Sequence, residues 1–526
     1  MEVAVASDMD KGKIWKLALS GLVLAKLTGA AYLAGKVRSV RAGLSEPRDP
    51  FEWKPERGRT VFLKGANVVD VKQGQVLRER GVVFKDGTIL ELVGTRDLDK
   101  VSADRVFDCT GMFLIPGLIN AHVHVLMPGA GFIDLELILS VKRQAVRNLE
   151  DCAVNGVTTI RDASACSGVL NEISQAVEKL EILGPRVVGC GAALKAPGGY
   201  PEFSKQLPRF IANKIGDMAI NVDSPESGRE AVRCAVDQGA RFIKLFFDDR
   251  SLFYGHKPLP VIDDESVRAI VDEAHRLGRK VAVHQSQLEG FRRAVRLGVD
   301  DFEHVPIDGF LEPSDVKAFM AGEHHVTPTV SVGMALGIAR KGHPARKEPL
   351  VEAMQAERER LLWQLSPGFS EPAVLKSNMK LVSLYMDGEA ETMRGSKKMF
   401  DPELYLGSFE KKNPNLQMLY EAGATICCGN DGGTPMGWPG MLFEEMELLE
   451  WFGISRIDIL RAATINGAKL LDMESELGSI EPGKHADMVL LAADPTEDLK
   501  AVERVQAVFR SGVLLHKGPG FTSQVG

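Results

Sequence analysis

Strand-like and helix-like segments alternate through the middle of this chain, and this alternation constrains the fold more than any other feature. The helical segments 264–277 and 288–297 have apolar periodicity and stop just before Gly278 and Gly298, as glycine commonly follows a helix C-terminus. Strands that alternate with helices predict a parallel sheet, and eight such units predict a TIM (β/α)8 barrel. The eight strand candidates are residues 118–124, 157–162, 186–192, 241–247, 280–285, 300–305, 326–332 and 425–431.

Shorter strand-like segments occupy both ends of the chain. Residues 61–63, 68–71, 81–84 and 89–93 precede the barrel, and 487–491 and 505–510 follow it. Lys85-Asp86-Gly87 separates two of them and is typical of a β-hairpin turn. We therefore expect three parts, namely an N-terminal arm with a short apolar helix and a linker (1–58), a small β-sandwich domain formed by both ends (59–115 plus 475–526), and the barrel (116–474) with an insertion at about 333–424.

The composition is that of a soluble globular protein. Of 526 residues, 44% are hydrophobic and 26% are charged, and the formal net charge of −7 excludes the basic surface typical of nucleic-acid binding. The seven cysteines form no CxxC pair, so the sequence predicts neither a disulfide framework nor a thiolate zinc site. A reducing, cytoplasmic location fits this cysteine usage.

The N-terminal arm leaves several interpretations open. Its apolar run, residues 17–25, is flanked by Lys16 and Lys26 and is too short to span a bilayer alone. It fits an ordinary packed helix, a helix that contacts a membrane surface or another subunit, or a signal or anchor for export.

Metal-ligating residue types stand at the predicted strand ends. His122 and His124 close the first strand, and side chains two apart on a strand point the same way, so both rings can reach one ion. Four imidazoles, a carboxylate and a lysine at the catalytic rim of a barrel suit a pair of divalent ions, with Zn²⁺ the best match and a single ion the alternative. Such ions acidify water, which then attacks substrate near neutral pH. The full set is His122, His124, Lys244, His284, His304 and Asp431.

These residues lie in motifs that resemble the amidohydrolase superfamily, in particular its imidazolonepropionase-like and prolidase-like branch. The resemblance extends over about residues 60–515. The flanking segments are similar to those of the family as well: FLIPGLINAHVHV at 113–125, AATINGAKLL at 462–471 and LGSIEPGKHADMVLL at 477–491. The motifs are His122-Val-His124, Phe242-Ile-Lys-Leu245, Val281-Ala-Val-His284, Phe302-Glu-His304 and Gly429-Asn-Asp431.

The resemblance implies a barrel plus β-sandwich, metal binding, hydrolysis at an amide or related bond, and a homo-oligomer. It implies that His122, His124 and Asp431 hold the more buried metal and that His284 and His304 hold the second. Lys244, carboxylated by CO₂, would bridge both, because a free ammonium beside two cations is disfavoured. Some relatives use one metal and an unmodified lysine, so that alternative stays open. Asp431 is also the candidate catalytic base that moves the proton of the attacking water.

Residues outside the ligand set are candidates for contact with a small-molecule substrate. Tyr254 and His256 lie in the loop after the fourth strand, and Tyr200 lies in the loop after the third. The insertion at about 333–424 fits either substrate selection or subunit contact, because insertions at this face of a barrel usually shape the pocket.

Three functions fit the sequence. The first is hydrolysis of an amide bond in a peptide-like compound or an N-acyl amino acid by a metal-activated water. The second is hydrolysis of a cyclic amide, a lactone or a phosphotriester in the same site. The third is a family member without catalysis that acts as a binding protein. The sequence does not identify the substrate, because the pocket loops follow no spacing rule.

Overall fold

The computed structural model describes residues 58–129, 135–201, 219–250, 258–332, 370–386, 414–518, 520–521 and 523–524. The predicted N-terminal arm up to residue 57 lies outside these ranges, as do Tyr254, His256 and residues 333–369 and 387–413 of the predicted insertion. None of the helices within the ranges combines the length and the hydropathy that crossing a bilayer requires.

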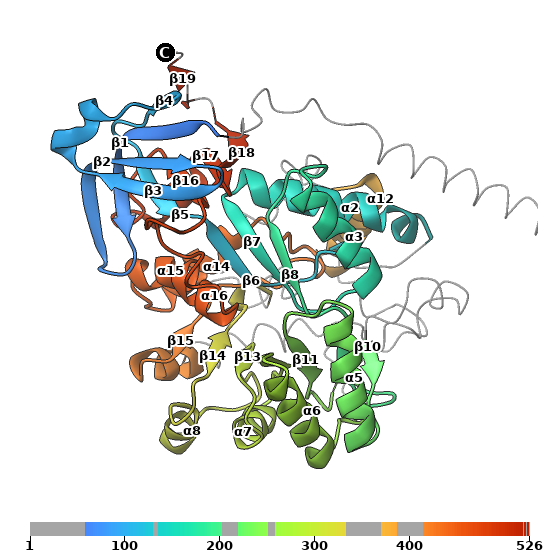
Figure 1. Ribbon diagram of the computed structural model, residues 1–526. Coiled ribbons are helices and arrows are strands. Elements are labelled where there is room, and N and C mark those ends of the chain that lie inside the picture. The colour runs from blue at the N-terminus through green and yellow to red at the C-terminus, as the bar shows by residue number, and fades with distance from the viewer. Residues whose placement is uncertain are drawn as a thin grey trace, which may run out of the picture.

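The two ends of the chain form one nine-stranded sheet, and Figure 1 shows its blue and red strands side by side. Its main path runs β18-β17-β16-β5-β1-β2-β3, with β4 and β19 paired beside β1. The turn between β2 and β3 holds Asp86 and Gly87 at φ of 48° and 82°, which confirms the predicted hairpin. The strands are β1 (Thr60–Asp70), β2 (Gln75–Lys85), β3 (Thr88–Val93), β4 (Arg105–Asp108), β5 (Phe113–Pro116), β16 (Met488–Leu491), β17 (Val505–Arg510), β18 (Val513–Lys517) and β19 (Ser523–Gln524).

Aromatic rings pack together in an apolar core formed by strands of this sheet. Phe84 and Phe509 meet edge to face with ring centroids 5.6 Å apart, and Phe107 stacks on Phe521 at 4.7 Å. The predicted strands 61–63 and 68–71 are parts of one strand, β1, whose register shifts twice. The exact boundaries of the end domain stay a prediction.

The middle of the chain forms parallel strands in two sheets. One sheet has the order β6-β7-β8 and the other β10-β9-β11-β12-β13-β14-β15. The parallel arrangement follows from the helices that connect successive strands. The strands are β6 (Leu118–Val123), β7 (Val157–Asp162), β8 (Arg186–Gly189), β9 (Ala193–Lys195), β10 (Ala219–Asn221), β11 (Ile243–Phe246), β12 (Val281–His284), β13 (Asp301–Glu303), β14 (His325–Thr327) and β15 (Thr425–Ile426).

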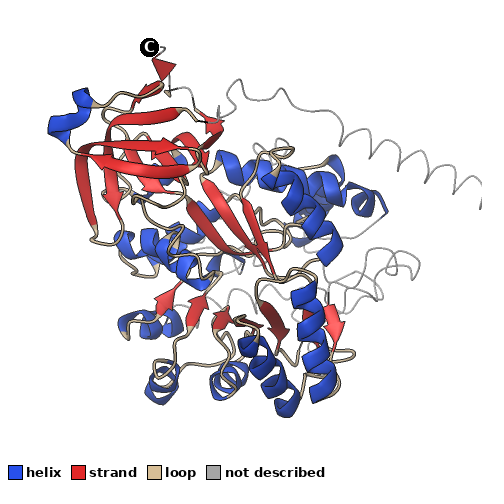
Figure 2. Ribbon diagram, in the orientation of Figure 1, coloured by secondary structure: helices blue, strands red, loops and turns tan. Residues whose placement is uncertain are grey.

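Helices follow most of these strands, and Figure 2 shows them on the outer side of the parallel strands. α6 and α7 confirm the predicted segments, and Gly278 and Gly298 have positive φ just beyond their ends. One helix, α12, lies within the predicted insertion. The helices are α2 (Leu135–Val154), α3 (Ser167–Glu178), α5 (Pro225–Asp237), α6 (Asp264–Arg276), α7 (Leu288–Arg296), α8 (Pro313–Phe319), α12 (Pro372–Met386), α14 (Leu442–Trp451), α15 (Arg456–Ala462) and α16 (Ile465–Leu470), with 3₁₀ helices η1 (Thr95–Lys100) and η6 (Leu499–Glu503).

Three predicted strands differ from the structure. The third, 186–192, ends early as β8 at Gly189, which pairs with β7, and a separate strand, β9, begins at Ala193 and pairs with β11. The seventh ends at Thr327, because Pro328 has no N–H to continue a ladder. The eighth is a strand only at β15, and Asp431 at its predicted end has a φ of 52°, which is incompatible with extended backbone.

The segment after β15 lies against β6 through main-chain hydrogen bonds. The Ala121 N–H donates to Cys428 O at 2.8 Å, and the His124 N–H donates to Gly432 O at 2.7 Å. The Asp431 N–H donates to His122 O at 2.9 Å. These bonds bring the end of the first predicted strand beside the end of the eighth.

Candidate metal centre

Five of the six predicted ligands lie at or just beyond the carboxyl ends of parallel strands, and Lys244 is the second residue of its strand. His122 is on β6 with His124 directly after it, Lys244 is on β11, and His284 ends β12. In parallel barrel-type folds this edge carries the chemistry. His304 and Asp431 follow β13 and β15.

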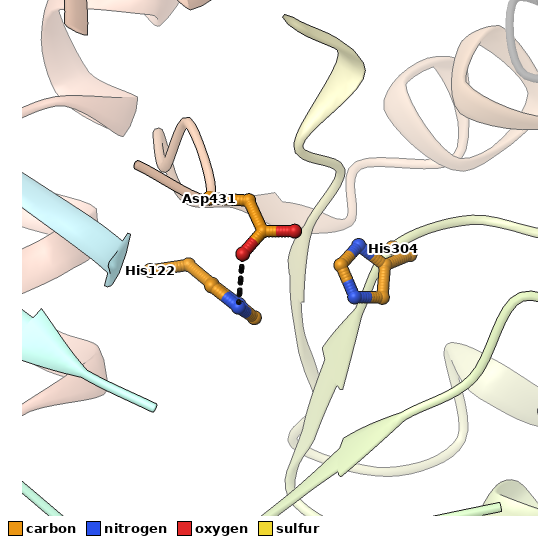
Figure 3. A group of neighbouring side chains, drawn as sticks. All are labelled: His122, His304 and Asp431. Carbon is orange, nitrogen blue, oxygen red and sulfur yellow. Dashed lines mark ion pairs between the residues drawn. The ribbon is translucent and has the colours of Figure 1, made fainter. Parts of the chain in front are cut away.

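Three side chains converge on one point, and we call them the first ligand group: His122, His124 and Asp431. The two Nε2 atoms are 3.3 Å apart, and each lies 3.2 Å from Asp431 Oδ1. Figure 3 shows Asp431 directed at the His122 ring. Ligands about 2.0–2.1 Å from a tetrahedral Zn²⁺ are about 3.3 Å from one another. The observed spacing therefore fits three ligands of one zinc-sized ion.

The backbone around Asp431 explains why glycines flank it. Gly429 lies so close to β6 that a Cβ there would be 2.7 Å from the main-chain nitrogen of His122. Gly433 has a φ of 109°, and a Cβ there would collide with the carbonyl oxygen of His124. Only glycine accepts such an approach and such a φ without strain. The glycines thus let the Asp431 segment pack directly on the strand that carries both histidines.

His284 and His304 form the second ligand group. His284 Nδ1 lies 2.8 Å from His304 Nε2. The other nitrogen of each ring points outward, His284 Nε2 to Asp248 Oδ2 at 3.1 Å and His304 Nδ1 to Thr329 Oγ1 at 2.5 Å. His304 and Thr329 have φ of 72° and 44°, a strained backbone that clusters at functional sites.

The two groups are adjacent. The ring centroids of His122 and His304 are 5.3 Å apart, and Figure 3 shows His304 across from His122 and Asp431. One ligand atom from each of these three buried residues lies within 4.8 Å of the others. This spacing is compatible with two neighbouring ions, one in each group, or with one ion held between the groups.

Lys244 is buried beside the two groups and opposite a carboxylate. Its Nζ contacts Glu303 Oε2, while Glu303 Oε1 lies 2.9 Å from Arg161 Nη1 and 3.4 Å from His122 Nδ1. Burial, together with the charge of Arg161, lowers the pKa of Lys244 to about 7. The amine therefore loses its proton far more readily than an exposed lysine.

Burial also sets the protonation of the ligand groups. It lowers the pKa of His122, His284 and His304, which keeps these rings neutral and able to bind a metal. Burial alone would raise the pKa of Asp431, but the interactions with His122 and His124 outweigh it and hold that pKa well below its usual value. The site thus presents neutral imidazoles and an ionised carboxylate.

Asp431 Oδ1 is buried and makes no hydrogen bond within the described ranges, although the Nε2 atoms of His122 and His124 both lie 3.2 Å from it. Lys244 Nζ and Glu303 Oε2 are also buried, and they form an ion pair with each other. A buried carboxylate oxygen without a hydrogen bond is costly, and a bound cation would compensate Asp431 Oδ1. The donor set and this oxygen fit a divalent ion.

The three predicted substrate contacts have different outcomes. Tyr200 lies inside the site, where its ring stacks on His284 with centroids 5.0 Å apart and an interplanar angle of 30°. It also meets Phe246 edge to face at 5.6 Å. Its contact with substrate stays a prediction, and Tyr254 and His256 lie outside the described residues.

The sequence did not point to the residues that surround the ligands, namely Asp248, Thr329 and Glu303. Each is a polar side chain at or just beyond the carboxyl end of a buried strand, which is the one signal that could have found them. Glu303 even stands within the Phe302-Glu-His304 motif. Their contacts depend on neighbouring strands, and no sequence spacing reveals these.

Comparisons with known proteins identify relatives of this chain. The chain is 24% identical to ochratoxinase of Aspergillus niger over 511 residues, covering 92% of each chain. Its fold matches the crystal structure of a Xaa-Pro dipeptidase with bound methionine (TM-score 0.66, 21% identity, 87% of this chain and 100% of that one) and that of A. niger ochratoxinase (TM-score 0.65, 20% identity, 88% and 97%). The model of the amidohydrolase family matches residues 113–515. Since this match spans well over half of the sequence, the chain belongs to the amidohydrolase family.

Proposed function

We propose that this protein is a metal-dependent hydrolase that cleaves an amide bond in a peptide-like compound or an N-acyl amino acid. One observation carries the proposal: His122, His124 and Asp431 place three ligand atoms 3.2–3.3 Å apart at the carboxyl ends of parallel strands. This spacing suits a catalytic zinc site, which takes three protein ligands and keeps a position open. Membership of the amidohydrolase family supports hydrolysis.

The amide preference is supported by the relatives. A Xaa-Pro dipeptidase and an ochratoxinase share the fold over most of the chain. Because the identities are only 21% and 20%, these comparisons show a shared fold. The substrate class is our proposal.

We assign one Zn²⁺ to the first ligand group and a second to His284 and His304. When bound there, zinc would supply Lewis-acid polarisation of a water molecule and of the amide carbonyl. Asp431, which is ionised, would accept the proton of the attacking water and pass it to the leaving nitrogen. The neutral imidazoles keep their lone pairs available because the rings are buried.

We assign the bridging position to Lys244, which is buried and interacts electrostatically with His122, His284 and His304. Its unprotonated amine adds to the carbon of CO₂, an N–C bond forms and one proton is released, which leaves an anionic carbamate with two oxygens. Carboxylation would also replace the ammonium that otherwise stands beside the cations. A site with one ion and an unmodified lysine is the alternative that metal analysis would reveal.

We also propose that the two parallel sheets form a single closed (β/α)8 barrel. The bonds between 121–124 and 428–432 support closure at one border, and the short link of residues 190–192 between β8 and β9 supports it at the other. The fold of the solved relatives is consistent with this arrangement.

A substrate screen with metal analysis tests the function. Purified protein is assayed on dipeptides, N-acyl amino acids, lactones and phosphotriesters, beside His122→Ala and the control His275→Ala on the exposed face of α6. We expect amide hydrolysis that is lost in His122→Ala together with the metal and is kept in the control. Hydrolysis of lactones or phosphotriesters alone would replace the amide assignment, and metal binding without any hydrolysis would favour a binding protein.

A further inference from the structure

Asp248 is a buried carboxylate on the outer side of the second ligand group. It follows β11 by two residues, and its side chain is only 2% exposed. Its Oδ2 lies 3.1 Å from His284 Nε2. The residue takes part in no step assigned so far, so its burial beside a ligand calls for a reason.

Two donors from Ser286 fix the orientation of this carboxylate. The Ser286 N–H donates to Asp248 Oδ1 at 2.8 Å, and the Ser286 hydroxyl donates to Oδ2 at 2.5 Å. Each oxygen thus has a defined donor, and Oδ2 faces the imidazole as well. The carboxylate is held in place by groups that do not belong to either ligand group.

The contact with Asp248 determines which nitrogen of His284 carries the proton. An ionised carboxylate only accepts hydrogen bonds, so the ring must donate from Nε2. A neutral imidazole then has its lone pair on Nδ1. Nδ1 is the atom that faces His304 Nε2 at 2.8 Å, inside the site.

We infer that Asp248 is a positioning residue that fixes the tautomer of His284 and so makes Nδ1 a metal ligand. The inference rests on the proposed metal-dependent function. Outer carboxylates of this kind orient ligating histidines and raise their basicity. Thr329 cannot do the same for His304, because a hydroxyl both donates and accepts and so permits either tautomer.

The variants Asp248→Asn and Asp248→Ala separate positioning from mere filling of space. In Asp248→Asn the Ser286 N–H still requires an acceptor, so the amide oxygen faces Ser286 and the NH₂ group faces His284 Nε2. The amide then donates to Nε2 and moves the ring proton to Nδ1, the wrong tautomer. In Asp248→Ala neither tautomer is imposed. A positioning role therefore makes the isosteric Asn variant worse than Ala, whereas a filling role makes it milder.

Zinc titration of metal-free protein by calorimetry measures the effect. We expect the affinity of the second ion to fall by about 10- to 100-fold in Asp248→Asn and by less in Asp248→Ala, while the first ion binds as in the wild type. Asp249→Asn is the matched control, because this neighbouring carboxylate is 54% exposed and bonds to Gln287 away from the site. It should bind both ions normally.

Nitrogen-15 NMR of histidine-labelled, metal-free wild type reads the tautomer without any metal or variant at Asp248. The resonances of His284, identified by their loss in His284→Gln, should show a protonated Nε2 and an unprotonated Nδ1. The opposite tautomer, or equal affinities in Asp248→Asn and wild type, would overturn the inference. Wild-type protein that shows the expected tautomer but binds no zinc would refute the proposed function and the ligand role of Nδ1. Only the effect of Asp248 on the tautomer of His284 would then remain.

Discussion

The two ligand groups are built by different means. His122, His124 and Asp431 are brought together by the backbone, since the His124 and Asp431 N–H groups bond across the junction between β6 and the segment after β15. In the part of the chain that the structure describes, the Nδ1 atoms of both rings make no hydrogen bond, although His122 Nδ1 lies 3.4 Å from Glu303 Oε1. His284 and His304 instead have side-chain partners, Asp248 and Thr329.

This difference predicts different sensitivity to substitution. A ligand group set by main-chain bonds and by close-packed glycines tolerates changes in surrounding side chains. A group whose rings are oriented by side chains depends on each of them. The first group should therefore bind its ion more tightly and keep it when the second is damaged.

The largest effect should distinguish loss of a first-group ligand from loss of a second-group ligand. His122→Ala removes one of three converging atoms, so we expect loss of both ions and a fall in kcat/KM of roughly 10³-fold or more, since a metal contributes several kcal/mol of transition-state stabilisation. His284→Ala should keep one ion per chain. Metal analysis by mass spectrometry beside the assay checks this, and retention of one ion by His122→Ala but none by His284→Ala would reverse the comparison.

Asp431→Asn tests whether the first group also moves protons. Asparagine keeps an oxygen that can bind metal but cannot accept the proton, so we expect kcat to fall by about 10²- to 10⁴-fold with KM little changed. Metal content is measured on the same sample, because the amide is a weaker ligand. If the variant retains both metal and near-normal kcat, Asp431 does not carry the proton.

A smaller effect concerns the pH dependence of stability without metal. Burial depresses the pKa of His122, His284 and His304, so the unfolded chain binds protons that the folded protein does not. The free energy of unfolding should therefore decrease as pH falls through about 6.5, by up to about 1.4 kcal/mol per pH unit for each ring. Urea unfolding at about pH 7.5 and about pH 5.5 measures this change, because these two values bracket the ordinary histidine pKa.

Replacement of His304 by glutamine removes one of these rings and should make that pH dependence shallower. An unchanged slope in His304→Gln would mean that this ring does not remain neutral in the folded protein.

The smallest effect is expected outside both groups. Deletion of residues 1 to about 45 removes no ligand, so kcat/KM should stay within about 2-fold of the full chain, the scale of a change that costs under 0.5 kcal/mol. Association with vesicles or between copies should change instead, as sedimentation would show. A truncated protein that binds both ions but has no activity would show that the arm contributes to a site.

The sequence predicted the ligands better than their surroundings. His122 and His124 could be paired because strand geometry places residues two apart on one side, and the structure brings both beside Asp431. Helices α6 and α7 were predictable from apolar periodicity and a terminal glycine. These signals are local, so one sequence suffices to read them.

The remaining features depend on contacts between distant segments. Asp248 meets His284 because β11 and β12 are neighbours, and nothing in the local sequence fixes the distance between the two side chains. The position of Tyr200 on the His284 ring is likewise a tertiary contact. The early end of the third strand at Gly189 also lacked a local signal, whereas Pro328 could have indicated the early end of β14.

The measurement that tests the central claim most directly is the anomalous zinc signal in crystals of active protein. The account predicts a peak about 2.0–2.2 Å from His122 Nε2, His124 Nε2 and Asp431 Oδ1, with a second peak beside His284 Nδ1 and His304 Nε2. Chelation should remove the peaks and the hydrolysis together. Protein that remains fully active after chelation, with no metal at these atoms, would contradict the account.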